Sequence, residues 1–375
     1  MKTTCAAVLP VISTRRSPAS FIGRPHQPKP QFHRRNNMLT SHMAKEAAAT
    51  PHMLRSQAAR WQLEATQIRS LVDGRASTVL LGRGSSGNVC TFATYLFALQ
   101  SGRQPIEFRP WLSTQTVPMA DWSDAVAYAF SYSGQSTDIA ASAEWLHARG
   151  ALVVAVTQAD AASDACLLKP AQQMIHLGCG QELAVPATKS VIAQLFVAAA
   201  LAGYNITQAA EQSADCMLQI EVQAVPGQLA TFLAGARTVT WLARGPSYGG
   251  ALEAALKLQE SVGIPAFGYS TAEYLHGPIA AASPADRVVL FTASDEPMET
   301  KQAVVAALLA RGVPFLCLGC DQTLDAQIPL PFPAARWART AVLAYIAQRT
   351  CATLAERYGI NPDLHPSLRK ITQTI

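Results

Sequence analysis

The hydrophobic positions of this chain alternate between short strand-like runs and longer helix-like patterns. Between residues 46 and 72, apolar residues recur at helical spacing, which predicts a leading helix or helix pair. A short apolar run at 77–81 stops at a Gly-Ser turn and is followed by a helical pattern over 89–99, which predicts strand, tight turn and helix. The same order recurs within 125–156. Strands that alternate with helices are typical of a parallel sheet with helices on both faces.

The second half of the chain repeats the first. The run 238–242 leads into Ala243-Arg-Gly-Pro-Ser247, which lies 161 residues beyond Gly82-Arg-Gly-Ser-Ser86. A second pair of segments, 311–318 and 149–156, matches at an offset of 162. Equal spacing of separate segments predicts two copies of one doubly wound domain.

These patterns predict an α/β fold of two tandem doubly wound parallel-sheet domains, related by an internal repeat and followed by a C-terminal tail. We expect residues 46–215 to form domain 1 with its leading helices, and residues 216–375 to form domain 2 with the tail. A helical region near 188–234 is expected to join them. Residues 1–45 are expected to be an extension outside the fold.

Composition and charge agree with this organisation. The chain has 375 residues, of which 49% are hydrophobic and 15% charged, as in a globular protein with two cores. The net charge of +5 includes eight basic and no acidic residues in 1–45, so residues 46–375 carry about −3 and show no nucleic-acid footprint. No run of 18 apolar residues occurs, which predicts no membrane span.

The basic, Pro-rich extension allows three interpretations. It is an organellar transit peptide, a disordered tail, or translated upstream sequence with the true start at Met38 or Met43. We favour the last two, because the remaining chain looks self-contained.

The eight cysteines lie in apolar segments, where a free thiol commonly serves as a small buried residue. They predict reduced thiols and a cytoplasmic location. Cys317 and Cys320 have the spacing of a redox pair or half a zinc site, but no second pair accompanies them, so a structural role is favoured and no metal is expected.

Two loops in the first domain combine glycine with small hydroxyl side chains. The first contains Gly84, Ser85 and Ser86, and the second runs from Ser131 to Thr137. Ligands of open parallel sheets bind beyond the carboxyl ends of the strands, where helix N-termini favour anions. The alternative is that these residues merely cap helices. Because one domain has two such loops, we favour a phosphate site, and the absence of the Walker lysine argues against a nucleotide.

In the second domain, charged residues form a stripe on a helix that is otherwise small or apolar. Glu253, Lys257 and Glu260 fall at i, i+4 and i+7 and therefore share one face. A solvated ion pair is the simpler explanation. Their apolar neighbours instead favour buried carboxylates beside a lysine, whose altered proton affinities suit acid–base chemistry. His276 precedes Gly277-Pro278, which predicts a turn and a position on a loop.

At these residues the chain resembles the SIS (sugar isomerase) family, particularly its glucosamine-6-phosphate deaminases and the isomerase half of glucosamine-6-phosphate synthase. The similarity extends over roughly residues 46–375. The matching segments are 82–88, 130–136, 182–189, 251–260, 272–278 and 361–374.

The resemblance implies a role for each candidate residue. Glu260 would move a proton between C1 and C2 of the sugar, His276 would assist ring opening, and Lys370 in the tail would close over the substrate. Glu253 would support this set, with Val185 and Lys257 lining the site. The phosphate and the sugar would be held by Gly84, Ser85, Ser86, Ser131, Tyr132, Ser133 and Ser136. No cofactor is implied.

The sequence departs from the family pattern at two positions of the pocket. Gly87 stands where an Asp is usual, and Tyr132 where a Gln is usual, so the environment of the phosphate or sugar hydroxyls is expected to differ. Such enzymes commonly form homodimers in which the histidine loop reaches the neighbour's site. Nothing before Glu46 would form the glutaminase domain of the synthase, which leaves ammonia as product or substrate.

The leading hypothesis is deamination of glucosamine 6-phosphate to fructose 6-phosphate and ammonia. One alternative is a related isomerase or deglycase that acts on another amino-sugar phosphate or a fructosamine phosphate. A different class is a sugar-phosphate sensor without catalysis, which Glu260 and His276 disfavour.

Overall fold

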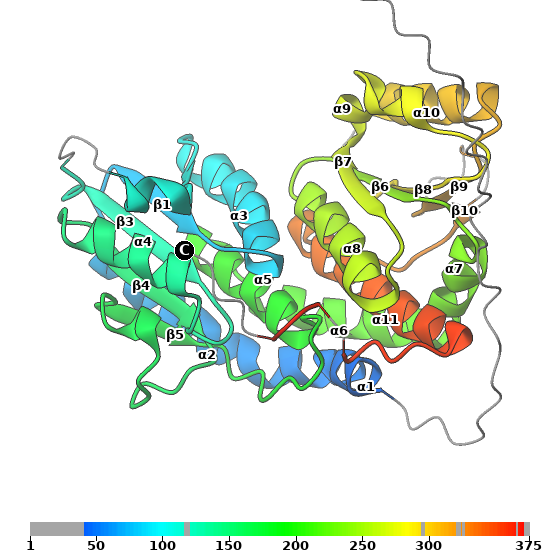
Figure 1. Ribbon diagram of the computed structural model, residues 1–375. Coiled ribbons are helices and arrows are strands. Elements are labelled where there is room, and N and C mark those ends of the chain that lie inside the picture. Colours follow the sequence, from blue (N-terminus) through cyan, green and yellow to red (C-terminus); the bar gives the residue numbers. More distant parts are fainter. Residues whose placement is uncertain are drawn as a thin grey trace, which may run out of the picture. The chain divides into compact units, whose positions relative to one another are not determined.

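Two five-stranded parallel sheets organise the described part of the chain (Figure 1). The first has the order β2-β1-β3-β4-β5 and the second β10-β9-β8-β6-β7, so the second, read from its other edge, repeats the first. Thr78 pairs with Val126 and Thr240 pairs with Val288, which places equivalent pairs 162 residues apart. The predicted internal repeat and fold class are confirmed.

The strands match the predicted runs within one or two residues where the sequence gave a strong apolar signal. They are β1 Ser77–Leu81, β2 Ile106–Glu107, β3 Ala125–Phe130, β4 Leu152–Thr157, β5 Gln173–His176, β6 Val239–Ala243, β7 Ala266–Ser270, β8 Arg287–Phe291, β9 Phe315–Leu318 and β10 Gln327–Ile328. Edge strands β2, β5, β7 and β10 were not predicted, because they are short or carry polar residues.

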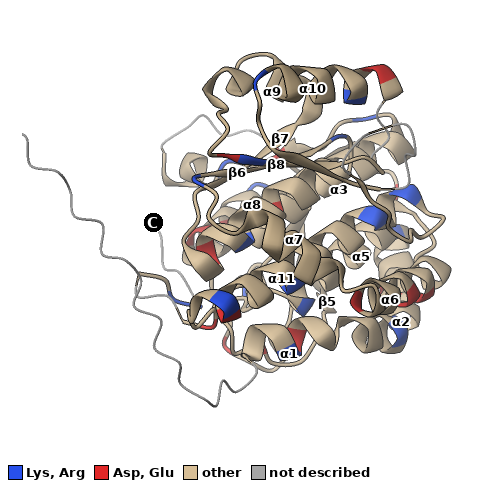
Figure 2. Cartoon of the chain, turned by 90° about the vertical axis from the view of Figure 1, so that its right-hand side faces the viewer, with Lys and Arg blue, Asp and Glu red and all other residues tan. Residues whose placement is uncertain are grey.

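Helices cover the sheets. They are α1 His42–Ala48, α2 Thr50–Leu71, α3 Ser85–Ser101, α4 Thr137–His147, α5 Lys189–Ala202, α6 Thr207–Val222, α7 Val225–Leu233, α8 Ser247–Val262, α9 Thr271–Leu275, α10 Met298–Ala310 and α11 Arg339–Tyr358. The predicted leading helix pair corresponds to α1 and α2, and the predicted joining region to α5, α6 and α7. Helices α2 and α6 lie side by side and carry charged residues of both signs (Figure 2). Arg55 of α2 pairs there with Glu211 and Asp215 of α6.

The structure describes residues 41–115, 121–293, 297–319, 324, 327–364 and 367–370. The first helix begins at His42, with Ser41 as its cap, so ordered structure starts before the Glu46 at which folding was expected to begin. Most of the predicted extension lies outside the described residues. None of the described helices combines the length and apolar character needed to cross a membrane.

The two domains share helices rather than a linker. The predicted boundary after residue 215 falls inside α6, whose Ala210 packs into the first core and whose Ile220 packs into the second. In α11, Tyr345 packs into the first core and Ile346 packs into the second. These two helices join the cores over several turns.

The equivalent helices α3 and α8 cross at a very short distance. A Cβ at Gly249 of α8 would lie 2.7 Å from the carbonyl oxygen of Asn88 in α3. Only glycine fits there without moving a helix. This contact brings the charged stripe of α8 against the first turn of α3.

Most of the described cysteines are buried, as expected for small core residues. Cys90, Cys179, Cys216 and Cys351 are buried thiols without a disulfide. Cys320 lies outside the described residues, so the structural role expected for Cys317 and Cys320 as a pair stays a prediction.

Candidate functional site

A pocket of about 570 Å³ lies beyond the carboxyl ends of β1 and β3. These strands are neighbours, but the chain leaves β1 toward β2 on the other side, so the pocket occupies a topological switch point, where open α/β sheets bind ligands. Its lining includes ten of the predicted site residues: Gly84, Ser85, Ser86, Ser131, Tyr132, Ser133, Ser136, Val185, Glu260 and Lys370.

The two serine loops form one side of this pocket as the starts of two helices. Gly84 precedes α3 with a φ of 52°, a conformation that favours glycine, and turns the chain so that the first N–H groups of α3 face outward. Ser136 precedes α4, and its hydroxyl lies 3.3 Å from that of Ser131. Two helix N-termini with neighbouring hydroxyls favour an anion such as phosphate.

An ion pair borders the same side. Arg83 Nε donates to Asp138 Oδ2 at 2.7 Å, and both residues line the pocket. Asp138 is 7% exposed, whereas the Arg83 side chain is 56% exposed. A cation is therefore fixed beside the predicted phosphate loops, which the sequence analysis did not anticipate.

The predicted stripe on α8 forms a second group of contacts below the pocket. Lys257 is fully buried and Glu253 is 1% exposed, whereas the Glu260 side chain is 21% exposed and reaches the pocket wall. Lys257 forms ion pairs with Glu260 and, at 3.3 Å, with Glu253. The shared helix face is confirmed. Lys257 lies beneath the pocket rather than on its surface.

Ser85 connects this stripe to the first domain. Its hydroxyl donates to Glu253 Oε1 at 3.0 Å and accepts from Lys257 Nζ at 3.2 Å. Asn88 Nδ2 donates to the other oxygen of Glu253 at 2.9 Å. The hydroxyl of Ser85 is thus already engaged, so we expect its backbone N–H rather than its side chain to face a bound anion.

Burial and mutual attraction set the charges of this group. Burial acts to lower the pKa of Lys257, but Glu253 and Glu260 outweigh it and raise the pKa overall, so this lysine is a fixed cation. Burial raises the pKa of Glu253 above its ordinary value. Glu260, beside a cation and open to the pocket, is placed to exchange protons with a ligand.

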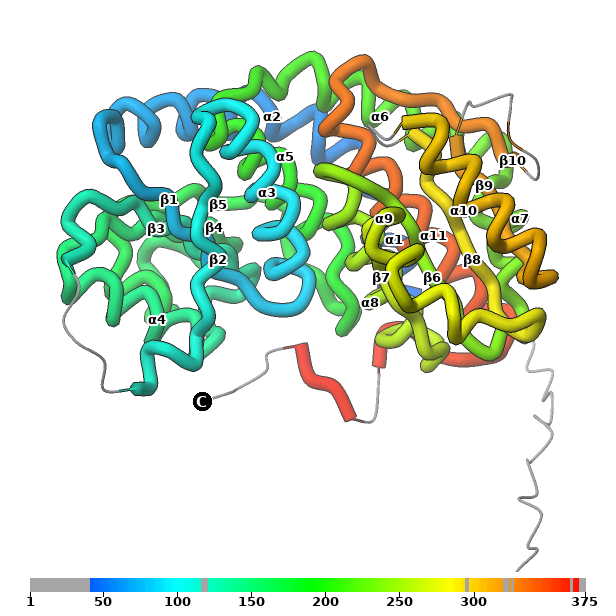
Figure 3. Tube along the Cα trace, turned by 90° about the horizontal axis from the view of Figure 1, so that it is seen from above, coloured from blue at the N-terminus to red at the C-terminus, as the bar shows by residue number. Residues whose placement is uncertain are grey.

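Lys370 reaches the opposite wall from the C-terminal segment, which lies between the two sheets (Figures 1 and 3). Its Nζ donates to Ala184 O at 2.7 Å and to Glu182 Oε2 at 3.1 Å. Residues 371–375 of the predicted tail lie outside the described residues. The role of Lys370 as a residue that closes over a ligand stays a prediction.

His276 is not part of this pocket in the single chain. It directly follows α9 and is exposed, as the predicted loop position required. It is absent from the pocket lining, so a role in this chemistry requires either a movement or a second copy of the chain.

Sequence reasoning overlooked several residues. Glu182, Asn88 and Glu46 make side-chain contacts at or behind the pocket. Glu182 and Asn88 lie in the matching segments but were given no role, and Glu46 was named only as the expected start of the fold. For Glu46 and Glu182, the available signal was a single acidic residue among small or apolar neighbours. Within the described ranges, no group of three or more His, Cys, Asp or Glu could hold a metal ion.

The geometry combines an anion site, a carboxylate beside a buried cation, and an amine within one pocket. That combination suits a small phosphorylated molecule that undergoes proton transfer. Comparison with known proteins agrees with this chemistry. The family model described as "SIS domain" matches residues 71–203 and 232–325, which is more than half of the chain.

Three known proteins illustrate the similarity. A glutamine--fructose-6-phosphate aminotransferase (isomerizing) of Bradyrhizobium diazoefficiens is 31% identical over 202 residues, which cover 50% of this chain and 33% of that protein. The chain therefore spans about a third of the length of such a relative.

Two solved structures share the fold. A glucosamine-6-phosphate deaminase from Thermotoga maritima superposes with a TM-score of 0.67 and 20% identity, covering 89% of this chain and 100% of that one. A tagatose-6-phosphate ketose/aldose isomerase from Escherichia coli gives 0.73 and 17%, covering 88% and 98%.

Proposed function

The chain belongs to the SIS domain family, and we propose that it is a phosphosugar isomerase that deaminates glucosamine 6-phosphate to fructose 6-phosphate and ammonia. The observation that carries the proposal is the single pocket in which the serine loops and Glu260 face the same space. A sugar phosphate would place its phosphate at the N-termini of α3 and α4 and its C1–C2 end near Glu260.

The proposed chemistry uses these groups in order. Glu260 removes the proton from C2 of the open-chain amino aldose while the aldehyde oxygen takes up a proton from solvent. Glu260 then returns its proton to C1 and the amine releases one N–H proton to solvent, which leaves a hydroxyl on C1 and an imine at C2. Water then adds to the imine carbon, and ammonia leaves as the ketone forms. Lys257 keeps Glu260 oriented between turnovers, since it is a fixed cation bonded to that carboxylate.

Product analysis tests the proposal. Purified protein is incubated with glucosamine 6-phosphate, and fructose 6-phosphate and ammonia are measured separately. We expect equal amounts of both, and none from unphosphorylated glucosamine, because the helix N-termini then lack their anion. Turnover only of galactosamine phosphate, a fructosamine phosphate or an unaminated hexose phosphate would reassign the substrate. Binding without turnover of any of them would indicate a sensor.

His276 is proposed to act in the pocket of a second copy, because it is exposed and outside its own pocket. Mixing two inactive variants tests this. Glu260→Gln and His276→Asn protomers are combined and allowed to exchange. Action across a dimer interface restores roughly a quarter of wild-type activity, since half of the dimers are mixed and each has one intact site. Action within one chain restores none. Light scattering after size-exclusion chromatography checks that the protein is a dimer.

A further inference from the structure

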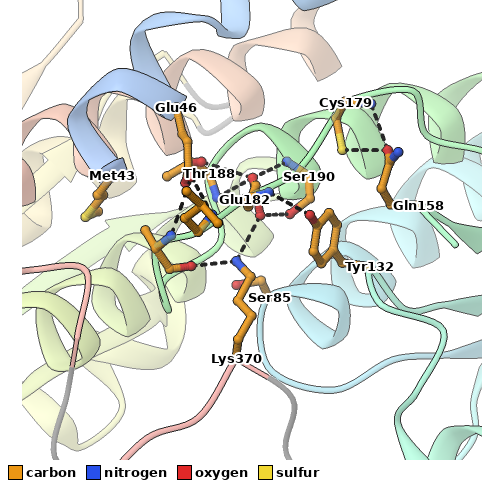
Figure 4. A network of polar contacts seen from close by, with 12 residues as sticks. Met43, Glu46, Ser85, Tyr132, Gln158, Cys179, Glu182, Thr188, Ser190 and Lys370 are labelled. Carbon is orange, nitrogen blue, oxygen red and sulfur yellow. Dashed lines mark hydrogen bonds and ion pairs between the residues drawn. The ribbon is translucent and has the colours of Figure 1, made fainter. Parts of the chain in front are cut away.

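The ammonium of Lys370 contacts three groups, of which two lie in the loop of residues 182–184 and the third is Tyr132 of the second serine loop (Figure 4). It donates to the carbonyl of Ala184 at 2.7 Å and to Glu182 Oε2 at 3.1 Å. It also lies 5.1 Å from the centre of the Tyr132 ring. A carbonyl, a carboxylate and an aromatic face are the three kinds of group that attract an ammonium ion.

Glu182 is a buried anion held ready for a cation. It is 4% exposed, and its oxygens accept from the backbone and side chains of Thr188 and Ser190 at 2.7–3.1 Å. Burial acts to raise its pKa, but Lys370 and Ser190 outweigh burial and lower the pKa overall. The bonds from Thr188 and Ser190 are neutral. Lys370 is the cation that pairs with this carboxylate, and a buried carboxylate is costly without one.

Tyr132 contributes its ring rather than its hydroxyl. The hydroxyl accepts from the N–H of Glu182 at 2.7 Å and lies 3.3 Å from the carbonyl oxygen of Gly180, to which it donates. Burial raises the pKa of this phenol to about 12, so the hydroxyl keeps its proton. Because its polar end is bonded to the backbone, Tyr132 presents its aromatic face to Lys370.

The loop that carries these contacts is fixed from its other side. Glu46 Oε1 of α1 accepts from the N–H groups of Leu183 at 2.5 Å and Ala184 at 3.4 Å. The N–H of Val185 donates to the carbonyl of Asp363 at 3.0 Å. The carbonyl that receives Lys370 therefore lies in a loop that is also held by contacts not made by the lysine.

We propose that Glu182, Tyr132 and the carbonyl of Ala184 form a dock for the Lys370 ammonium. Glu182 and Tyr132 are positioning residues: they hold the amine at one place on the pocket wall and keep the C-terminal segment across the pocket. The dock is a property of the protein without ligand. Its catalytic consequence, an amine pre-positioned beside the sugar, rests on the proposed function.

Protease protection of the tail tests the dock without any substrate. Arg369 is exposed, so an arginine-specific protease can release residues 370–375 once the tail leaves the pocket. Loss of the charge-assisted contacts in Lys370→Met is expected to accelerate this cleavage about tenfold. Tyr132→Leu, which lacks the aromatic face, is expected to accelerate it about threefold. Tyr132→Phe keeps the face and should be cleaved more slowly than the leucine variant.

Matched controls separate the dock from general effects. Lys169→Met makes the same change at an exposed lysine outside the pocket and should leave cleavage unchanged. Synthetic peptides of residues 364–375 with Lys or Met at position 370 correct for the protease's own preference. Thermal unfolding of each variant verifies that it folds. A Lys370→Met protein cleaved no faster than Lys169→Met would overturn the dock, and equal rates for the Phe and Leu variants would remove Tyr132 from it.

Turnover measurements then test the positioning role separately. With an active substrate, Tyr132→Leu is expected to lower kcat about tenfold while KM changes less than about twofold, because the lysine is misplaced and the phosphate contacts remain. A rise in KM at unchanged kcat would overturn positioning in favour of a simple binding contact. If no sugar phosphate is turned over, the proposed function fails while the protection result still decides the dock.

Discussion

The two domains have the same sheet order, yet they contribute to the pocket in different ways. In domain 1, α3 begins after Gly84 with Ser85 and Ser86, so its first turn offers N–H groups to an anion. In domain 2, the equivalent α8 begins after Pro246, which stands in the place of Ser85 and has no N–H to offer. Domain 2 instead contributes the side chain of Glu260, from the last turn of α8.

Domain 2 also has a buried lysine at the carboxyl end of its sheet, where domain 1 has the pocket. Lys301 of α10 is 6% exposed and donates to the carbonyl of Thr292, at the carboxyl end of β8, at 2.6 Å. In domain 1, the corresponding end of β3 leads to Ser131 and opens into the pocket. In the proposed function, one copy of the fold would provide the anion site and the other the acid–base group.

Glu260→Gln tests the contribution of domain 2 and has the largest expected effect. Loss of the proton-transfer group should lower kcat about 100- to 10,000-fold while sugar-phosphate binding persists, because the serine loops are untouched. Calorimetry with a sugar phosphate and steady-state assays measure the two separately. Glu144→Gln, at an exposed position of α4, is the matched control and should be silent. Retained turnover in the Glu260 variant would remove α8 from the chemistry.

Gly249→Ala tests the contact between the two domains. The added Cβ would lie 2.7 Å from the carbonyl of Asn88, so α3 and α8 must separate, at a cost of about 1–3 kcal/mol in unfolding free energy. Activity should fall together with the unfolding free energy, because Ser85 and Glu253 move apart. Gly227→Ala is the control in α7, where the nearest atom lies at 4.0 Å. Denaturant unfolding compares them, and equal stabilities would contradict the close approach.

Ser86→Ala and Ser247→Ala compare equivalent positions of α3 and α8. The first is expected to raise KM for a phosphorylated substrate about tenfold, because a hydroxyl donor to a charged group is lost. The second should leave KM unchanged, since domain 2 holds no phosphate in this scheme. If the two variants have the same KM, the division of roles between the domains is wrong.

Glu46→Gln has the smallest expected effect and tests a segment outside the repeat. Burial is the main cause that raises the pKa of Glu46 above its usual 4.5. A group with a raised folded-state pKa stabilises fully below the unfolded value, and that stability is lost as pH rises through the folded value. The variant should therefore melt about 1–2 °C higher than wild type near pH 8 and equally near pH 4. A lower melting temperature near pH 8 would indicate that the Glu46 charge stabilises the loop.

Local pattern was sufficient to predict much of the fold. The buried strands β1, β3, β4, β6 and β8 are continuous apolar runs, because both faces of a central parallel strand are covered. The repeat offset followed from the same runs. The short edge strands could not be predicted in this way, since β2 and β10 have two residues each and are too short to show a periodicity.

The sequence by itself determined the doubled α/β fold, the two serine loops and the shared face of Glu253, Lys257 and Glu260, because each depends on spacing within one segment. Only the tertiary structure decided which of these residues line one pocket. It buried Lys257 beneath Glu260, left His276 outside the pocket and joined Lys370 to Glu182, 188 residues away. Contacts between distant segments are set by packing of whole helices and sheets, which no local pattern records.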